Sequence, residues 1–169
     1  MTKSPLPFDP IERAAENWQR TWGDATHMRL ATSIMRVQQL LINAYDEALR
    51  PHGLTFARFE ALALLRFSRN GALPMKVIGD RLQVHPTSVT NIVERLSAAD
   101  LVQRQRNPKD GRGVLAVLTD RGREVVEAAA ADLMAMDFGL AALEDGQITS
   151  VVTALSTLRR SAGDFEVEQ

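Results

Sequence analysis

The sequence predicts a mainly α-helical fold with one small β-hairpin set among the helices. Apolar residues recur at helical spacing through most of the 169-residue chain. The pattern changes to short β-favouring runs at one place, between Leu101 and Leu118. With 45% apolar and 24% charged residues, the composition is that of a globular protein with one sizeable core.

The amino-terminal third predicts an arm and two helices. Prolines in the first dozen residues indicate a loose arm, and an amphipathic helix is expected over residues 11–22. A long helix is expected over residues 26–49, because apolar side chains recur there every three or four residues, and Pro51 and Gly53 end it.

The middle of the chain predicts three shorter helices. Thr55 is the expected N-cap of the first, which ends near Gly71. The second is expected over residues 74–82, with Pro74 in its first turn, and the third begins at Pro86. A three-residue turn separates these last two helices, which is the helix-turn-helix arrangement whose second helix enters the DNA major groove.

A β-hairpin follows, with strands at residues 101–106 and 114–118 and a turn-forming tip between them. Its position directly after a recognition helix is that of a wing. Thr119 then caps a helix to about residue 136, and a last helix carries Ile148 to Leu158. We therefore expect a winged helix-turn-helix at residues 55–118, an arm and dimerisation helices at 1–54, and further dimerisation helices at 119–169.

The outer helices carry more apolar surface than one winged domain can cover, which predicts a homodimer with twofold symmetry. The residues expected at the interface are Leu30, Ile34, Leu41, Leu133, Met136, Ile148, Val152 and Leu155.

The charge distribution favours a DNA-binding middle. The formal net charge is −1, but residues 74–123 hold nine Lys and Arg against five Asp and Glu. Such a basic segment between acidic flanks is expected of a protein that presents one face to phosphates, although it also occurs on ordinary solvated surfaces.

Small polar residues open the recognition helix, where side chains reach base edges. They are Thr87, Ser88, Thr90 and Asn91, with Arg95 one turn later. The alternative is that this turn favours Ser and Thr only for capping.

The predicted β-hairpin adds four cationic side chains to this candidate DNA-binding surface: Arg104, Arg106, Lys109 and Arg112. Arg112 is placed to enter a narrow minor groove, whereas Arg106 and Lys109 are placed to follow phosphates. The alternative is that these are solvated charges of an edge strand.

The sequence lacks the motifs that a metalloprotein or an enzyme would need. The chain has no cysteine, and its three histidines lie far apart, so we expect no metal site and no cofactor. It has no Gly-rich phosphate loop and no nucleophile motif, which argues against an enzyme. Neither a membrane span nor a signal peptide is evident, and a cytoplasmic location is the default expectation.

The run Asp110-Gly111-Arg112, followed by Leu118-Thr119 and Gly122, is similar to the wing signature of the MarR family of regulators. The upstream runs at residues 78–82, 89–96 and 101–104 resemble that family as well, and the resemblance covers roughly residues 30–158. It implies a dimer that binds a palindromic operator and releases it when a small, often aromatic or anionic, effector binds. It also implies that Asp110 pairs with Arg112 or the neighbouring backbone and preorganises the wing tip.

The effector candidates come from this resemblance, which implies a pocket between the dimerisation helices and the DNA-binding domain. Trp18 and Glu60 resemble the branch that responds to urate, but Ile92 stands where that branch has arginine, and the lack of cysteine departs from the hydroperoxide-sensing branch. The candidates are Trp18, Trp22, Arg36, Arg58, Phe59 and Glu60. The alternative for the aromatic residues is packing, and we expect Phe59 and Phe67 to belong to the core.

We therefore expect a sequence-specific, DNA-binding transcriptional regulator, a repressor that acts as a homodimer with double-stranded DNA and a small molecule as partners. The alternative is a winged-helix module that binds a ligand or a protein without binding an operator.

Overall fold

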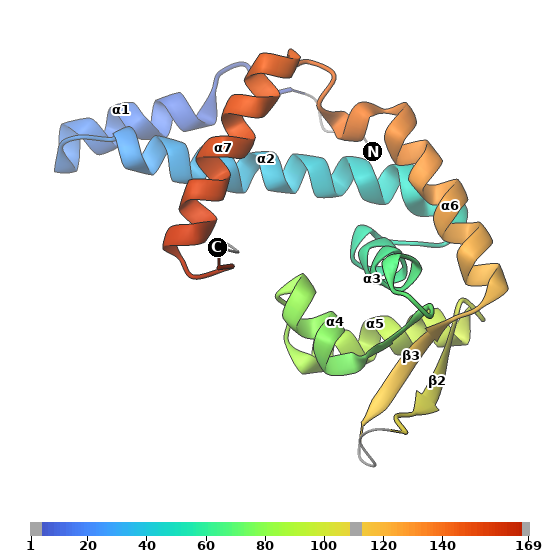
Figure 1. The fold of residues 1–169 in the computed structure, drawn as a ribbon. Helices are drawn as coiled ribbons and strands as arrows, with labels where there is room; N and C mark the ends of the chain where they lie inside the picture. The colour runs from blue at the N-terminus through green and yellow to red at the C-terminus, as the bar shows by residue number, and fades with distance from the viewer. Residues whose placement is uncertain (1–4, 109–112, 167–169) are drawn as a thin grey trace.

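The computed structural model describes residues 5–108 and 113–166. A long helix, α2, has a helical lobe and a small sheet gathered under one end, and α1 lies along the other end (Figure 1). In chain order the elements are α1 (Pro10–Trp22), α2 (Thr26–Leu49), η1 (Arg50–His52), α3 (Phe56–Phe67), β1 (Ala72–Pro74), α4 (Met75–Leu82), α5 (Pro86–Ala98), β2 (Val102–Arg106), β3 (Val114–Leu118), α6 (Asp120–Ala135), η2 (Asp137–Gly139) and α7 (Asp145–Ser161). The expected mainly α fold with a hairpin wing is confirmed.

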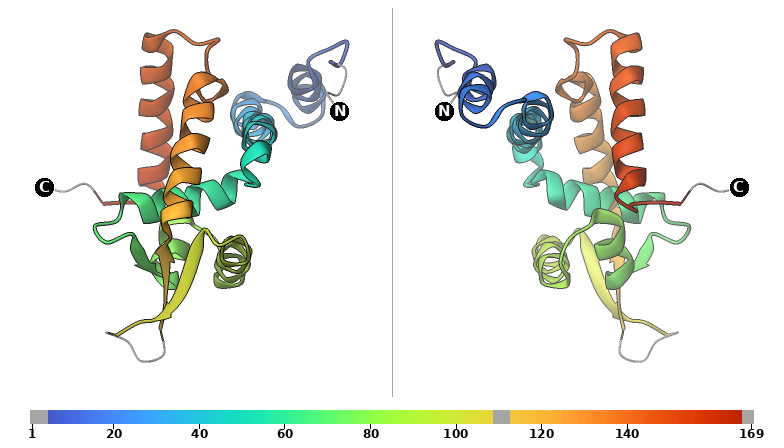
Figure 2. Two further views of the ribbon diagram at one scale, coloured as in Figure 1. Left: turned by 90° about the vertical axis from the view of Figure 1, so that its right-hand side faces the viewer. Right: turned by 90° about the vertical axis from the view of Figure 1, so that its left-hand side faces the viewer.

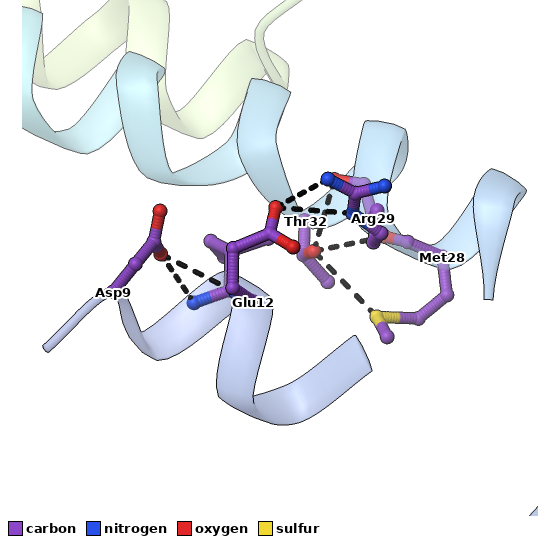
Figure 3. Close-up of polar contacts among 6 residues, drawn as sticks. Asp9, Glu12, Met28, Arg29 and Thr32 are labelled. Carbon is purple, nitrogen blue, oxygen red and sulfur yellow. Dashed lines mark hydrogen bonds and ion pairs between the residues drawn. The ribbon is translucent and has the colours of Figure 1, made fainter. Parts of the chain in front are cut away.

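Helix α1 is capped and tied to α2 by polar side chains (Figure 3). The Asp9 carboxylate accepts the backbone N–H groups of Ile11 and Glu12 at 2.8 and 3.3 Å, which satisfies two free donors of the first turn. Glu12 then forms an ion pair with Arg29 of α2. Helix α1 is therefore anchored to α2 by these side chains.

The core lies where the carboxyl-terminal half of α2 meets α3, α5, α6 and the sheet. Leu49, Leu62 and Leu65 are completely buried there. The Tyr45 hydroxyl donates a 2.8 Å hydrogen bond to the carbonyl of Phe138, which joins α2 to the turn after α6. Together these contacts hold the winged lobe, which we define as α3 to β3, under the end of α2.

The sheet has a third strand that the sequence analysis missed. Its order is β1-β3-β2, all antiparallel, and Pro74 of β1 faces Leu115 of β3. The expected start of a helix at Pro74 was therefore wrong, because Pro74 ends an edge strand, where its missing N–H costs no ladder bond, and α4 begins at Met75.

Of the two aromatic residues expected in the core, only Phe59 is there. Its side chain is buried, whereas Phe67 is 82% exposed. Phe67 is the last residue of α3 and lies beyond the turns that pack on the core. The expectation for Phe67 was wrong.

The outer helices leave apolar side chains uncovered within the chain. Leu30 and Ile34 of α2 are exposed, as are Val152 and Leu155 of α7, and α7 buries none of its residues. Figure 1 shows α7 diverging from α6 after the turn that joins them.

Part of the expected dimer interface is used inside the chain instead. Leu133 is fully buried, and Leu41 and Met136 pack against the core. The face of α6 that carries Leu133 therefore packs in the chain's own core, whereas the sequence predicted that it would lie at the dimer interface.

A close backbone approach fixes the base of the wing. Thr119 caps α6 by accepting the Gly122 N–H at 2.9 Å, and its hydroxyl donates to the Asp100 carbonyl at 2.8 Å. A side-chain carbon built at Gly122 would lie 2.1 Å from the Leu101 carbonyl oxygen. Only glycine allows α6 to begin this close to the end of α5.

Gly122→Ala should lower the free energy of unfolding by about 3 kcal/mol, because a methyl group would force backbone apart at the junction of α5, the wing and α6. Urea denaturation followed by circular dichroism measures the change. Gly146→Ala is the matched control in α7, where an added carbon meets nothing within 4 Å. Equal stability of the two variants would contradict this reading of the wing base.

Candidate nucleic-acid interface

Helix α5 is held in the lobe by one buried face. Val89, Val93 and Leu96 are at most 1% exposed and contact the core. The helix therefore cannot rotate without exposing them, and its opposite face is presented outward.

The sequence-predicted contact residues lie on or beside that outward face. Thr87, Ser88, Asn91 and Arg95 are exposed, whereas Thr90 is half-buried. The Thr90 hydroxyl already donates to the Pro86 carbonyl at 3.1 Å. Ser88 and Asn91 make no side-chain hydrogen bond to the described part of the chain, so their donors and acceptors remain available to a ligand.

A histidine that the sequence analysis did not select begins the recognition helix. His85 is exposed and is the N-cap of α5, with its Nδ1 accepting the backbone N–H of Thr87 at 3.3 Å. The same Nδ1 lies 3.1 Å from the Thr87 hydroxyl oxygen, so the His85 ring is held against the first turn of α5 at the edge of the interface. Its position directly before Pro86 was the available signal.

The wing lies next to the recognition helix and is joined to it. Arg104 of β2 reaches Glu94 of α5, with 3.5 Å between Nη1 and Oε1. Arg106, the last residue of β2, is exposed and pairs in register with Val114. The Asn107 N–H donates to the Gly113 carbonyl at 2.9 Å and closes the described part of the hairpin.

Three predicted wing-tip residues, Lys109, Asp110 and Arg112, lie outside the described residues. The described interface thus joins the exposed face of α5 to the cationic strand β2, which extends from the lobe in Figures 1 and 2.

The effector candidates do not come together within the chain. Trp18 and Trp22 stack edge to face on α1, with ring centroids 4.7 Å apart. Arg58 donates to the Gly53 carbonyl at 3.2 Å, and Phe59 is part of the core.

Arg36 and Glu60 line two different hollows. Arg36 lines one of about 600 Å³ between the amino-terminal arm and α2. Glu60 lines another of about 380 Å³, together with Arg81, Gln83 and Asp164. Burial raises the pKa of the Glu60 carboxyl. Within the described residues, Arg36 and Glu60 therefore belong to separate hollows.

Residues 5–108 and 113–166 hold neither a candidate membrane span nor a candidate metal cluster. No described helix is long and apolar enough to cross a membrane. No group of three or more His, Cys, Asp or Glu in the described residues is placed to hold a metal ion.

This arrangement of α4, turn, α5 and a three-stranded wing defines a winged helix-turn-helix protein. Residues 52–113 match the MarR family model. The repressor Rv2887 of Mycobacterium tuberculosis (strain ATCC 25618 / H37Rv) is 30% identical over 68% of this chain and 81% of its own length. The chain belongs to the MarR family and is a DNA-binding transcriptional regulator.

Two solved structures and one further relative extend the comparison. The MarR-family regulator Sco5413 of Streptomyces coelicolor is 54% identical over 84% of this chain and 99% of its own, with a TM-score of 0.79. MosR of M. tuberculosis, solved in complex with DNA, is 27% identical over 79% of this chain and 95% of its own, with a TM-score of 0.67. The repressor MdtR of Bacillus subtilis (strain 168) is 32% identical over 56% of this chain, and the match covers 65% of its length.

Glu60→Gln should raise the free energy of unfolding at pH 7. A raised pKa means that the folded protein disfavours the charged carboxylate, so that removing the charge stabilises it above that pKa. The gain should disappear as the pH falls below about 4, where glutamate is protonated in both states. Urea denaturation at pH 7 and pH 4 measures this, with Glu124→Gln on the exposed surface of α6 as control. Lower stability at pH 7 would mean that a favourable contact holds the charge.

Proposed function

We propose that this protein is a homodimeric repressor that binds a palindromic operator and leaves it when a small, often aromatic or anionic, effector binds. The observation that carries the proposal is the exposed polar face of α5 beside cationic β2, fixed by the buried face of the same helix. The names of Rv2887 and MdtR as repressors support the direction of regulation. The chain divides, on this proposal, into a DNA-binding domain at residues 55–118 with dimerisation regions at 1–54 and 119–169.

The contact residues divide by chemistry. Asn91 is best suited to read a base, because an exposed amide can bond an adenine edge in two places. Thr87 and Ser88 lie at the same end of α5, whereas Thr90 is placed to contribute its methyl group, since its hydroxyl donor is used in the helix. On this proposal, Arg95 and Arg106 contact phosphates. The roles of Lys109, Asp110 and Arg112 rest on the resemblance of the wing.

The uncovered apolar surface supports the dimer. Exposed side chains on the first half of α2 and along α7 have the helical spacing of a packing face, and a single chain leaves them in water. Twofold pairing of these faces would bury them and place two recognition helices about 34 to 36 Å apart, which matches half-sites one helical turn apart.

Asn91→Ala should weaken binding to the operator by about 1 to 3 kcal/mol and relax specificity at one base pair, with little change for random duplex. Arg106→Ala should weaken both DNAs alike and reduce the salt slope by about 1. Affinities for operator and random duplex at several salt concentrations measure both effects. Arg20→Ala, the same loss of charge on α1, is the control. If Asn91→Ala weakened both DNAs in the same proportion, the assignment of base reading would be wrong.

Val152→Asp should weaken the dimer at least about 100-fold, because each half of a symmetric interface would then bury an unpaired carboxylate. Sedimentation equilibrium at micromolar concentration measures the mass. Thr157→Asp places the same charge on the opposite face of α7 and should leave the dimer intact. A parent protein that sediments as a monomer, or a Val152→Asp variant that remains a dimer, would refute the proposed interface.

A further inference from the structure

The segment that follows α7, residues 162–166, returns to the winged lobe and contacts the turn of the helix-turn-helix. The Asp164 carboxylate is the link: one oxygen accepts from Gln83 Nε2, and the other accepts from Arg159 Nε at 2.6 Å. The Asp164 side chain is 17% exposed, although the helix before it buries no residue within the chain. We name residues 162–166 the C-terminal strap.

The strap is held against α7 by its own contacts. The backbone N–H groups of Gly163 and Asp164 donate to the carbonyls of Arg160 and Arg159, both at 3.0 Å. Gly163 has a φ of 74°, the left-handed conformation that reverses the chain at a helix end. The guanidinium groups of Arg159 and Arg160 lie 5.2 and 6.0 Å from the centre of the Phe165 ring. The carboxylate of Asp164 is therefore placed by α7 rather than by a free tail.

The partner of Asp164 is the residue that determines how the chain leaves α4. Gln83 ends α4 in the left-handed region, with φ 52° and ψ 40°, and α5 begins three residues later at Pro86. A non-glycine residue in this conformation is disfavoured on its own and persists where its surroundings hold it. The hydrogen bond from the Gln83 side chain to Asp164 provides such a hold at the turn itself.

We propose that Asp164 is a positioning residue for the recognition helix, which ties the turn between α4 and α5 to the end of α7. Because α7 carries the apolar face assigned to the dimer, the tie transmits the geometry of the dimer to the DNA-reading helix; this consequence rests on the proposed function. The strap does not contact DNA. It acts by restricting the orientations of the winged lobe before binding, which favours a spaced operator over random duplex.

A double-mutant cycle tests the proposal. Asp164→Ala removes both contacts, and Gln83→Asn shortens the donor while keeping a residue that tolerates the left-handed conformation. Each single variant and the double variant should lose operator affinity by the same factor, about fivefold to tenfold, with random duplex unaffected. Glu166→Ala, which removes an exposed carboxylate of the same segment, is the control and should bind like the parent. Losses that multiply in the double variant, or no loss at all, would overturn the proposal.

Asp164→Asn supplies the conservative comparison. It keeps an acceptor oxygen for Gln83 and loses the charge that faces Arg159, so operator affinity should stay within about threefold of the parent. An equal loss for Asp164→Asn and Asp164→Ala would assign the effect to the Arg159 pair and overturn the role of the Gln83 bond.

Hydrogen exchange at the backbone amides of residues 79–85 provides a readout that does not depend on dimerisation or operator choice. Exchange at the turn should be faster in Asp164→Ala and Gln83→Asn than in the parent, and unchanged in Glu166→Ala. Unchanged exchange in the first two variants would show that the strap does not hold the turn. A parent that fails to dimerise or to select an operator would refute the proposed function, and the exchange result would still decide whether Asp164 holds the turn.

Discussion

The orientation of the face that we propose binds DNA depends on the burial of the opposite side of α5. Val89, Val93 and Leu96 enter a core made by α3, the sheet and the end of α2, so the rotation of α5 about its axis is determined by packing. The same core reaches the wing through Leu118 and the close contact of Gly122 with the Leu101 carbonyl. Recognition helix and wing are therefore positioned by one set of apolar contacts.

That core also explains why some helices bury their apolar faces within the chain and others leave them exposed. The carboxyl-terminal half of α2 and the inner face of α6 pack in this core, whereas α7 and the amino-terminal half of α2 keep exposed apolar residues. Most of the stability of a helix in a protein comes from packing, and α7 fully buries none of its residues within the described chain. On the proposed function, association and DNA binding fall to different helices, and the C-terminal strap is a polar contact between the end of α7 and the turn before α5.

The sequence was most informative where local chemistry ends an element. Prolines, glycines and caps predicted the limits of α1, α2 and α6, and the start of α5, to within one or two residues. The sequence-based prediction failed where the outcome depended on distant segments. Strand β1 has only three residues and forms because it pairs with β3. Phe67 was expected in the core because the sequence does not show that the end of α3 extends beyond the elements that pack on it. The His85 cap was missed because histidine is not among the preferred capping residues.

By itself, the amino-acid sequence determined the order of helices and hairpin and the polar start of the recognition helix, since these depend on periodicity and on contacts between near neighbours. Only the tertiary structure decided which apolar faces are covered within one chain and which long-range polar partners meet. Trp18, Arg36 and Glu60, grouped by resemblance, lie in separate surroundings, whereas Gln83 and Asp164, which are 81 residues apart, are joined. The physical reason is that local patterns constrain a helix's faces, but only packing of the whole chain sets which faces meet.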